Sequence, residues 1–281
     1  MTRSASRTTR RAALGLTGLL LATACSGGST LAGDAPPSAT TAPSSGPSAP
    51  SSAAPAGLTG PVVVFAASSL TEAFTTIGEG FEAAHPGVTV TYNFGASSAL
   101  AQQITAGAPA DVFAAASPAT MKVVTDAADA ADPTVFVRNR LEIAVPHDNP
   151  GKVTGLADFA KQPLKIALCA EKVPCGAAAL KVFRASGVTP APDTLEQDVK
   201  AALSKVELGE VDAALVYRTD VLAAGDKVRG IEFPEAADAV NDYPIAMTKA
   251  APHPDAAAAF VEQVLSAEGQ KVLADAGFQT L

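Results

Sequence analysis

A regular alternation of short apolar segments and amphipathic segments runs from residue 61 onwards and constrains the fold more than any other feature. It begins with VVVFAASSLTE at 62–72, where the apolar residues 62–65 predict a buried strand. After Ser69 the apolar residues recur at helical spacing, which predicts a helix over 69–84. Repeated strand–helix units predict an α/β fold with mostly parallel sheets flanked by helices, and 281 residues suffice for two packed domains.

The same patterns assign the remaining elements of the body. We expect further strands at 88–94, 110–115, 135–137, 141–145, 164–168, 213–217, 231–233 and 245–247. We expect further helices after 95–98, after 117–118, and over 176–185, 199–208, 255–265 and 268–276.

Residues 1–24 have the pattern of a secretory signal peptide. Arginines precede a short apolar segment, AALGLTGLLLATA at 12–24, which is too short to span a membrane. The sequence LATAC at 21–25 resembles a bacterial lipobox and predicts lipidation of Cys25, with an ordinary cleavage site near Cys25 as the alternative. The pair Arg10-Arg11 leaves the export route open between the Sec and the twin-arginine pathways.

Residues 25–60 consist almost wholly of Ser, Gly, Thr, Ala and Pro. A segment with so few large apolar side chains cannot bury enough surface to fold. We therefore expect a disordered tether between Cys25 and a body that starts at residue 61. These features predict a lipoprotein on the outer face of the cell membrane.

Two further cysteines, Cys169 and Cys175, lie within the predicted body. In an exported protein such a pair is expected to form a disulfide, and two reduced thiols packed between a helix and a strand are the alternative. The spacing does not fit a CxxC redox motif, and the three histidines are scattered along the chain.

Small or hydroxyl residues stand where several predicted strands lead into helices. A helix start offers free N–H groups and the positive end of the helix dipole, so it can bind an anion without a basic side chain. Ser69, followed by Glu72, also fits a capping box, which would make Ser69 only a helix cap. The four junctions are Ala67-Ser68-Ser69, Gly95-Ala96-Ser97-Ser98, Val173-Pro174-Cys175-Gly176 and Gln197-Asp198-Val199.

Donors converging from these junctions, with the Tyr217 hydroxyl at a strand end, suit a fully ionised tetrahedral oxyanion, because its oxygens accept hydrogen bonds and donate none. Two acceptors lie near the junctions. We interpret Asp198 as a helix cap and Asp111 as a strand-edge group.

Motifs spread over 61–281 resemble those of one family. They are FAASSL at 65–70, FGASSALAQQITAGAPADVF at 94–113, VPCG at 173–176, DVKAAL at 198–203 and ALVY at 214–217. In this order they resemble the molybdate-binding proteins of bacterial ABC importers, which are cluster D, type II periplasmic binding proteins.

The resemblance implies two lobes joined by two crossover strands that act as a hinge. Lobe I would comprise 61–141 with 246–281, lobe II would comprise 146–241, and the hinges would lie near 142–145 and 242–245. The oxyanion-binding residues implied by the family motifs are Ser69, Ser97, Cys175, Val199 and Tyr217, with Ser68 and Ser98 as possible additional ones. Cys175 and Val199 would donate through the backbone; the family commonly has Ala in place of Cys175.

The resemblance also implies the ligand and the partners. The protein would capture molybdate, and also tungstate, and deliver it to the membrane subunits of an ABC permease. It would act as a monomer, carry no cofactor and catalyse no reaction.

Several other functions remain open from the residues alone. The nearest alternative is a binding protein for another anion, such as sulfate, phosphate or an organic acid. A serine hydrolase would need Ser69 or Ser97 beside one of the histidines (His85, His147 and His253), and the chain has no G-x-S-x-G motif. A metal-binding lipoprotein would use the same histidines with carboxylates. A formal net charge of −8 without a basic stripe argues against a nucleic-acid partner.

Overall fold

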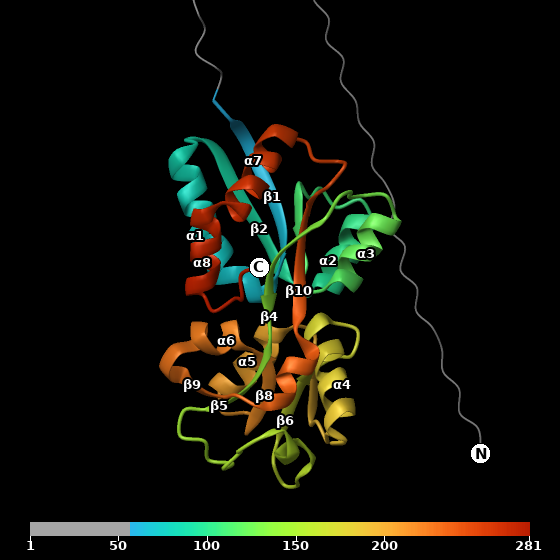
Figure 1. Ribbon diagram of the computed structural model, residues 1–281, viewed down its shortest axis with the longest axis vertical. Coiled ribbons are helices and arrows are strands. Elements are labelled where there is room, and N and C mark those ends of the chain that lie inside the picture. The colour runs from blue at the N-terminus through green and yellow to red at the C-terminus, as the bar shows by residue number, and fades with distance from the viewer. Residues whose placement is uncertain (1–56) are drawn as a thin grey trace, which may run out of the picture. The chain divides into compact units, whose positions relative to one another are not determined.

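The computed structural model describes residues 57–281, which form two α/β lobes (Figure 1). The first lobe contains a five-stranded sheet in the order β2-β1-β3-β10-β4, and the second contains a five-stranded sheet in the order β7-β6-β8-β5-β9. The predicted signal peptide, the lipidated Cys25 and most of the predicted tether lie outside the described residues. The first strand begins at Thr59, two residues before the predicted start of the body.

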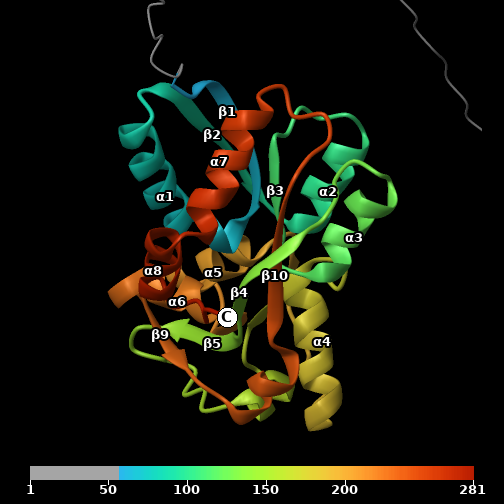
Figure 2. The ribbon, with the colours of Figure 1, turned by 45° about the horizontal axis from the view of Figure 1, so that its top comes forward.

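The first lobe takes its elements from two separate parts of the chain. Its strands are β1 (Thr59–Ala67), β2 (Gly87–Gly95), β3 (Val112–Ala114), β4 (Thr134–Asn139) and β10 (Asn241–Met247). Its helices are η1 (Ser68–Leu70), α1 (Thr71–Ala84), α2 (Ser97–Thr105), α3 (Pro118–Asp126), α7 (Pro254–Leu265) and α8 (Ala267–Asp275). Helices α1, α7 and α8 cover one face of the sheet, and α2 and α3 cover the other (Figures 1 and 2).

The second lobe is built from the intervening chain. Its strands are β5 (Leu141–Pro146), β6 (Ile166–Cys169), β7 (Thr194–Glu196), β8 (Ala213–Tyr217) and β9 (Val228–Ile231). Its helices are α4 (Pro174–Ser186), α5 (Val199–Glu207), α6 (Arg218–Ala224), and the short 3₁₀ helices η2 (Leu156–Ala160), η3 (Gly225–Lys227) and η4 (Pro234–Ala239). The predicted strand 231–233 is displaced to β9, and the sequence patterns missed β7 and α6.

The sheets are mixed rather than mostly parallel. In the first lobe β1 runs parallel to β2 and β3, while β10 runs antiparallel to β3 and β4. In the second lobe β6 runs parallel to β7 and β8, while β5 runs antiparallel to β8 and β9. The antiparallel pairs involve β5 and β10, the strands that follow each passage between the lobes, so they do not belong to strand–helix–strand units.

The chain passes between the lobes at two neighbouring points. Asn139, the last residue of β4, pairs with Asn241, the first residue of β10. The chain enters the second lobe through Arg140 and returns to the first at Asn241. The hinges predicted near 142–145 and 242–245 lie within β5 and β10, just after these two connections, and their role as hinges stays a prediction.

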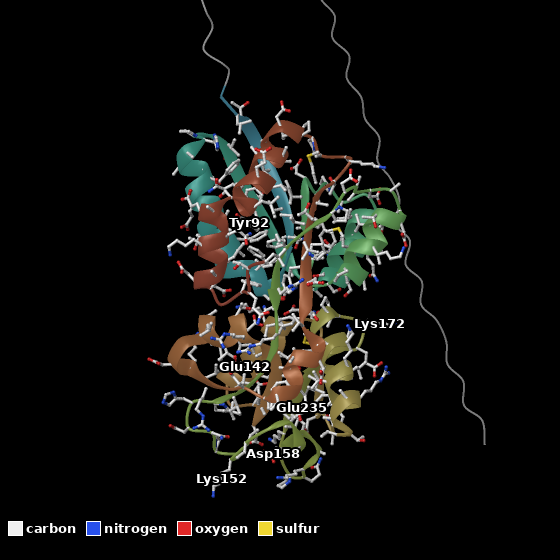
Figure 3. All side chains as sticks on the ribbon, in the orientation of Figure 1. Tyr92, Glu142, Lys152, Asp158, Lys172 and Glu235 are labelled. Atoms are coloured by element: carbon white, nitrogen blue, oxygen red, sulfur yellow. A yellow bond between two sulfur atoms is a disulfide. The ribbon has the colours of Figure 1, made fainter. Side chains whose placement is uncertain are left out.

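Each lobe has its own apolar core. The first lobe buries one cluster beneath α1, α7 and α8 and another beneath α2 and α3. Tyr92, labelled in the first lobe in Figure 3, borders the first of these clusters. Its ring stacks on Phe94 with ring centroids 4.8 Å apart, and its hydroxyl donates to the Phe74 carbonyl at 2.6 Å. The second lobe buries one continuous cluster. Two separate cores let the lobes behave as two bodies joined at the crossovers.

Candidate functional site

A small cavity lies between the two lobes, at the ends of β1, β2 and β8 and at the starts of α4 and α5. The cavity is small, with a volume of about 10 Å³. Its lining includes all five of the predicted binding residues, namely Ser69, Ser97, Cys175, Val199 and Tyr217. Ser68 also lines the cavity, whereas Ser98 does not.

Ser69 lies in η1, directly after β1, and is 4% exposed. The predicted capping box is wrong: α1 begins after Leu70 without a side-chain cap. The Ser69 hydroxyl instead forms a 2.9 Å hydrogen bond with the hydroxyl of Tyr243, a residue of β10. A long-range hydrogen bond has replaced the local one, and Ser69 lines the cavity.

Ser97 is the first residue of α2 and is 1% exposed. Its hydroxyl oxygen accepts a hydrogen bond from the backbone N–H of Ala116 at 2.9 Å. This bond uses only a lone pair of the oxygen, so the hydroxyl hydrogen of Ser97 remains available to a ligand in the cavity.

Cys175 lies in the first turn of α4 and forms the predicted disulfide with Cys169, the last residue of β6. The first N–H groups of a helix have no partner within the helix, and Pro174 at the helix start has no N–H at all. The backbone N–H of Cys175 is therefore the first donor that α4 offers at the cavity. The helix start packs tightly here: a Cβ on Gly176 would overlap the backbone carbonyl of Ala170.

Val199 begins α5 and contributes another helix N-terminus to the cavity. Asp198 is its N-cap, as predicted, and accepts a hydrogen bond from the Ala201 N–H at 2.9 Å. This cap turns a carboxylate of the cavity lining towards its own helix. Asp111, the other candidate acceptor, is also structural, because its carboxylate accepts the Val63 N–H at 2.7 Å.

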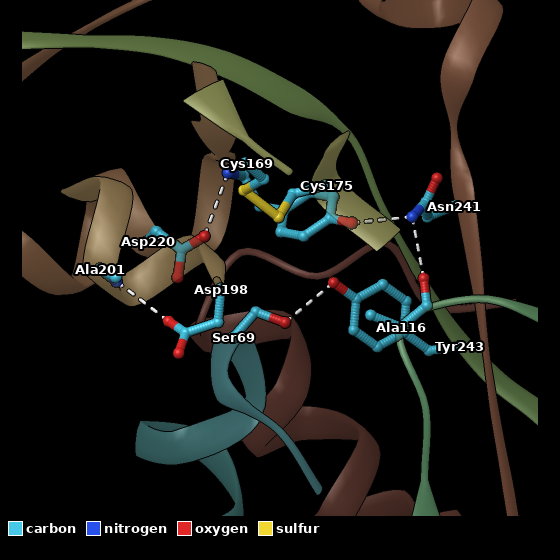
Figure 4. The surroundings of a disulfide bond; sticks show 10 residues. Ser69, Ala116, Cys169, Cys175, Asp198, Ala201, Asp220, Asn241 and Tyr243 are labelled. Carbon is cyan, nitrogen blue, oxygen red and sulfur yellow. Dashed lines mark hydrogen bonds between the residues drawn. A yellow bond between two sulfur atoms is a disulfide. The ribbon is translucent and has the colours of Figure 1, made fainter. Parts of the chain in front are cut away.

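Tyr217 ends β8 and is 1% exposed. Its hydroxyl oxygen accepts a hydrogen bond from the Asn241 side chain at 2.8 Å, and its backbone N–H donates to Asp220 at 3.0 Å (Figure 4). Burial, together with the neighbouring Tyr243, raises the pKa of the Tyr217 hydroxyl well above its ordinary value. The hydroxyl is therefore not ionised, and it can donate a hydrogen bond.

The cavity lining contains no Lys, Arg or His. Three basic residues directly adjoin lining residues in the sequence: Lys172, Lys200 and Arg218. Lys200, which follows Val199, forms a 2.7 Å ion pair with Glu72 across the two lobes. Lys200 also lies 3.6 Å from the buried carboxylate of Asp220. Its charge is thus shared between two carboxylates, and a ligand in the cavity would be held by hydrogen bonds and helix dipoles.

Neither the hydrolase nor the metal alternative gains support from residues 57–281. No hydrogen bond within this part of the chain joins Ser69 or Ser97 to a histidine, and His147 is exposed on a turn. The same residues contain no cluster of three or more His, Cys, Asp or Glu side chains placed to hold a metal ion. Nor do they include a helix with the length and apolarity to cross a membrane.

Sequence reasoning missed the residues behind the site, chiefly Tyr243, Asn139 and Asn241. Asn139 donates to the Thr219 hydroxyl at 2.9 Å, and Asn241 donates to Tyr217 and to the Ala116 carbonyl, each at 2.8 Å. The scarcity of tyrosine, three in the chain, was the one signal available for Tyr243.

Two α/β lobes with a small cavity between them are the architecture of the type II periplasmic binding proteins, so the predicted two-lobed fold is confirmed. More specifically, residues 62–279 match the family described as bacterial extracellular solute-binding protein, and the chain belongs to this family.

Individual relatives agree with this assignment. The molybdate-binding protein ModA of Mycobacterium tuberculosis (strain H37Rv) is 44% identical over 218 residues, which cover 77% of this chain and 84% of that protein. The putative ABC transporter substrate-binding lipoprotein YvgL of Bacillus subtilis (strain 168) is 34% identical over 224 residues, covering 77% and 85%. A solved structure, the substrate binding domain of a putative molybdenum ABC transporter from Clostridium difficile, is 31% identical with a TM-score of 0.60, covering 79% and 99%.

Proposed function

We propose that this protein captures molybdate in the cavity between its lobes and delivers it to an ABC permease. The observation that carries the proposal is the character of the cavity lining. Apart from Asp198, whose carboxylate caps its own helix, the polar side chains that line the cavity are hydroxyls: Ser68, Ser69, Ser97 and Tyr217. The starts of α4 and α5 add backbone N–H groups.

A dianionic tetrahedral oxyanion matches such a lining, because each of its oxygens accepts hydrogen bonds and none donates. Helix N-termini supply the partial positive charge that offsets the dianion, so no basic side chain is needed in the cavity. The names of the relatives, molybdate-binding in ModA and molybdenum in the Clostridium difficile transporter, support molybdate as the particular oxyanion. In this role the five predicted residues, Ser69, Ser97, Cys175, Val199 and Tyr217, hold the ligand.

Several finer features belong to the same proposal. The protein also takes tungstate, which has the charge and shape of molybdate. It is exported and held on the outer face of the cell membrane through a lipidated Cys25, works as a monomer, performs no catalysis and needs no resident cofactor. The name of the relative YvgL, a substrate-binding lipoprotein, supports the lipid anchor.

Calorimetric titration and thermal unfolding of the full chain with molybdate, tungstate, sulfate, phosphate and zinc test the ligand. A ligand that binds only the folded protein stabilises it by about 4 kcal/mol at a thousandfold excess over its dissociation constant, which corresponds to a rise in Tm of about 8–16 °C for a body of this size. We expect this rise with molybdate and tungstate alone. A rise with sulfate or phosphate instead would move the function to that anion, and a rise with zinc alone would refute oxyanion capture.

The adjacent serines of α2 provide a matched pair of variants for the site. Ser97→Ala removes a hydroxyl that lines the cavity, and we expect it to weaken molybdate binding roughly 10- to 100-fold, the weight of one hydrogen bond to a charged group. Ser98→Ala changes the next residue, which does not line the cavity, and should change the affinity less than about twofold. Equal affinities in both variants would contradict the assigned site.

Mass spectrometry of protein expressed in a bacterial host tests the anchor. A mature N-terminal peptide that starts at a diacylglyceryl-modified Cys25 is the expected species. An unmodified N-terminus at another small residue would remove the anchor from the proposal without affecting the ligand.

A further inference from the structure

Asn241 stands directly behind the cavity, at the point where the chain returns to the first lobe. It is the first residue of β10, is 6% exposed and does not itself line the cavity. Its side-chain Nδ2 donates two hydrogen bonds, one to the Ala116 carbonyl at 2.8 Å and one to the Tyr217 hydroxyl oxygen at 2.8 Å (Figure 4). Ala116 belongs to the first lobe and Tyr217 to the second, so one amide group joins both.

The chemistry of the partners fixes the direction of these bonds. The carbonyl oxygen of Ala116 can only accept, so the group of Asn241 that faces it must be the NH₂ and not the oxygen. An amide NH₂ carries two hydrogens, and the second one is directed to Tyr217. The orientation of the Asn241 amide therefore follows from the Ala116 carbonyl, which can only accept.

The direction of the Tyr217 hydroxyl follows in turn. Because its oxygen accepts from Asn241, its single hydrogen points elsewhere, and Tyr217 lines the cavity. The same arrangement holds for Ser97, whose oxygen accepts from the Ala116 N–H. One residue, Ala116, thus bonds to Ser97 through its N–H and to Asn241 through its carbonyl.

We propose that Asn241 is a positioning residue, which holds the Tyr217 hydroxyl so that its hydrogen is directed to the ligand in the cavity. The inference rests on the proposed function, since it concerns how the same cavity holds its ligand. Molybdate presents an acceptor oxygen to that hydrogen.

A double-mutant cycle on molybdate affinity separates positioning from a purely structural role. In the wild-type background, Asn241→Ala frees the Tyr217 hydroxyl to turn away, and we expect the dissociation constant to rise roughly tenfold, about the weight of one hydrogen bond. In a Tyr217→Phe background there is no hydroxyl to direct, so Asn241→Ala should change the dissociation constant less than about twofold. Equal losses in the two backgrounds would overturn the inference.

Asn149→Ala is the matched control. Asn149 is also a buried asparagine, 9% exposed, with hydrogen bonds to Val153 in the second lobe, and it does not line the cavity. We expect this variant to lower Tm and to leave the molybdate affinity unchanged. A Tm measurement on each variant confirms that it folds, and Asn241→Leu, which keeps the side-chain volume, replaces Asn241→Ala if the alanine variant does not fold.

If the wild type binds no oxyanion, the proposed function itself fails; if it binds molybdate but the two backgrounds lose affinity equally, only the role of Asn241 fails.

Discussion

Removing the disulfide between Cys169 and Cys175 should cost stability and leave ligand binding almost intact. The bond ties the end of β6 to the first turn of α4, and the two residues are six positions apart in the sequence. Both side chains are 3% exposed. Replacing both by alanine keeps the backbone N–H that Cys175 offers to the cavity, because any residue except proline supplies it.

The magnitude follows from the length of the closed loop. The chain-entropy model gives about 2.4 kcal/mol for so short a loop. For a body of this size, 1 kcal/mol shifts Tm by about 2–4 °C, so the double alanine variant should unfold about 5–10 °C below the wild type. Molybdate affinity should fall less than about fivefold, since the donor remains and only its restraint is lost.

Differential scanning calorimetry with and without a thiol reductant provides the assay. The wild-type Tm should fall in the reductant, while the Tm of the double alanine variant should not respond to it. Native protein with two free thiols at these positions, or a wild-type Tm that is the same after reduction proven by mass spectrometry, would refute the reasoning. A loss of binding beyond a hundredfold would show that the covalent link, and not the helix start, holds the donor in place.

Three further changes probe the surroundings of the cavity. Gly176→Ala places a Cβ against the Ala170 carbonyl and should lower the free energy of unfolding in urea by about 1–3 kcal/mol while weakening molybdate binding. Burial raises the pKa of Asp220 to about 6, although Lys200 lowers it. The carboxyl ionises at lower pH in the unfolded chain, so the free energy of unfolding falls as pH rises from about 4 to about 6. Asp220→Asn removes this loss, so the Tm of the variant should rise above that of the wild type across this window and stay above it at higher pH. Lys200→Met breaks the ion pair with Glu72 between the lobes and should speed ligand dissociation by at most about fivefold in stopped-flow measurements, since both groups are partly exposed.

The residues that face the cavity could be predicted because they occupy strand-to-helix junctions. Val199 and Ser97 both begin helices, and the short sequence patterns around them indicate this directly. Several such junctions gather at one place in an α/β fold because ligands bind outside the carboxyl ends of its strands. The convergence of donors was therefore a consequence of the predicted architecture.

The residues behind the cavity could not be predicted, because their partners lie far away in the sequence. Ser69 and Tyr243 are 174 positions apart, and nothing local to Ser69 distinguishes this bond from the capping box that its sequence favours. Asn241 lies at the start of a strand, where asparagine has no characteristic role. Strand direction could not be predicted for a similar reason. The alternation of apolar and amphipathic segments indicates which segments are strands and which are helices, but it does not indicate which strands run antiparallel in a sheet.

The order of strands in the first lobe has a consequence for synthesis of the chain. β10 lies between β3 and β4, and β4 has no other neighbour in its sheet. A growing chain that ends before Asn241 already contains all strands of the second sheet, β5 to β9, while the first sheet is still divided. The second lobe can thus mature on the ribosome or during export, whereas the first lobe, and with it Tyr243 behind Ser69, can be completed only when the last part of the chain has emerged.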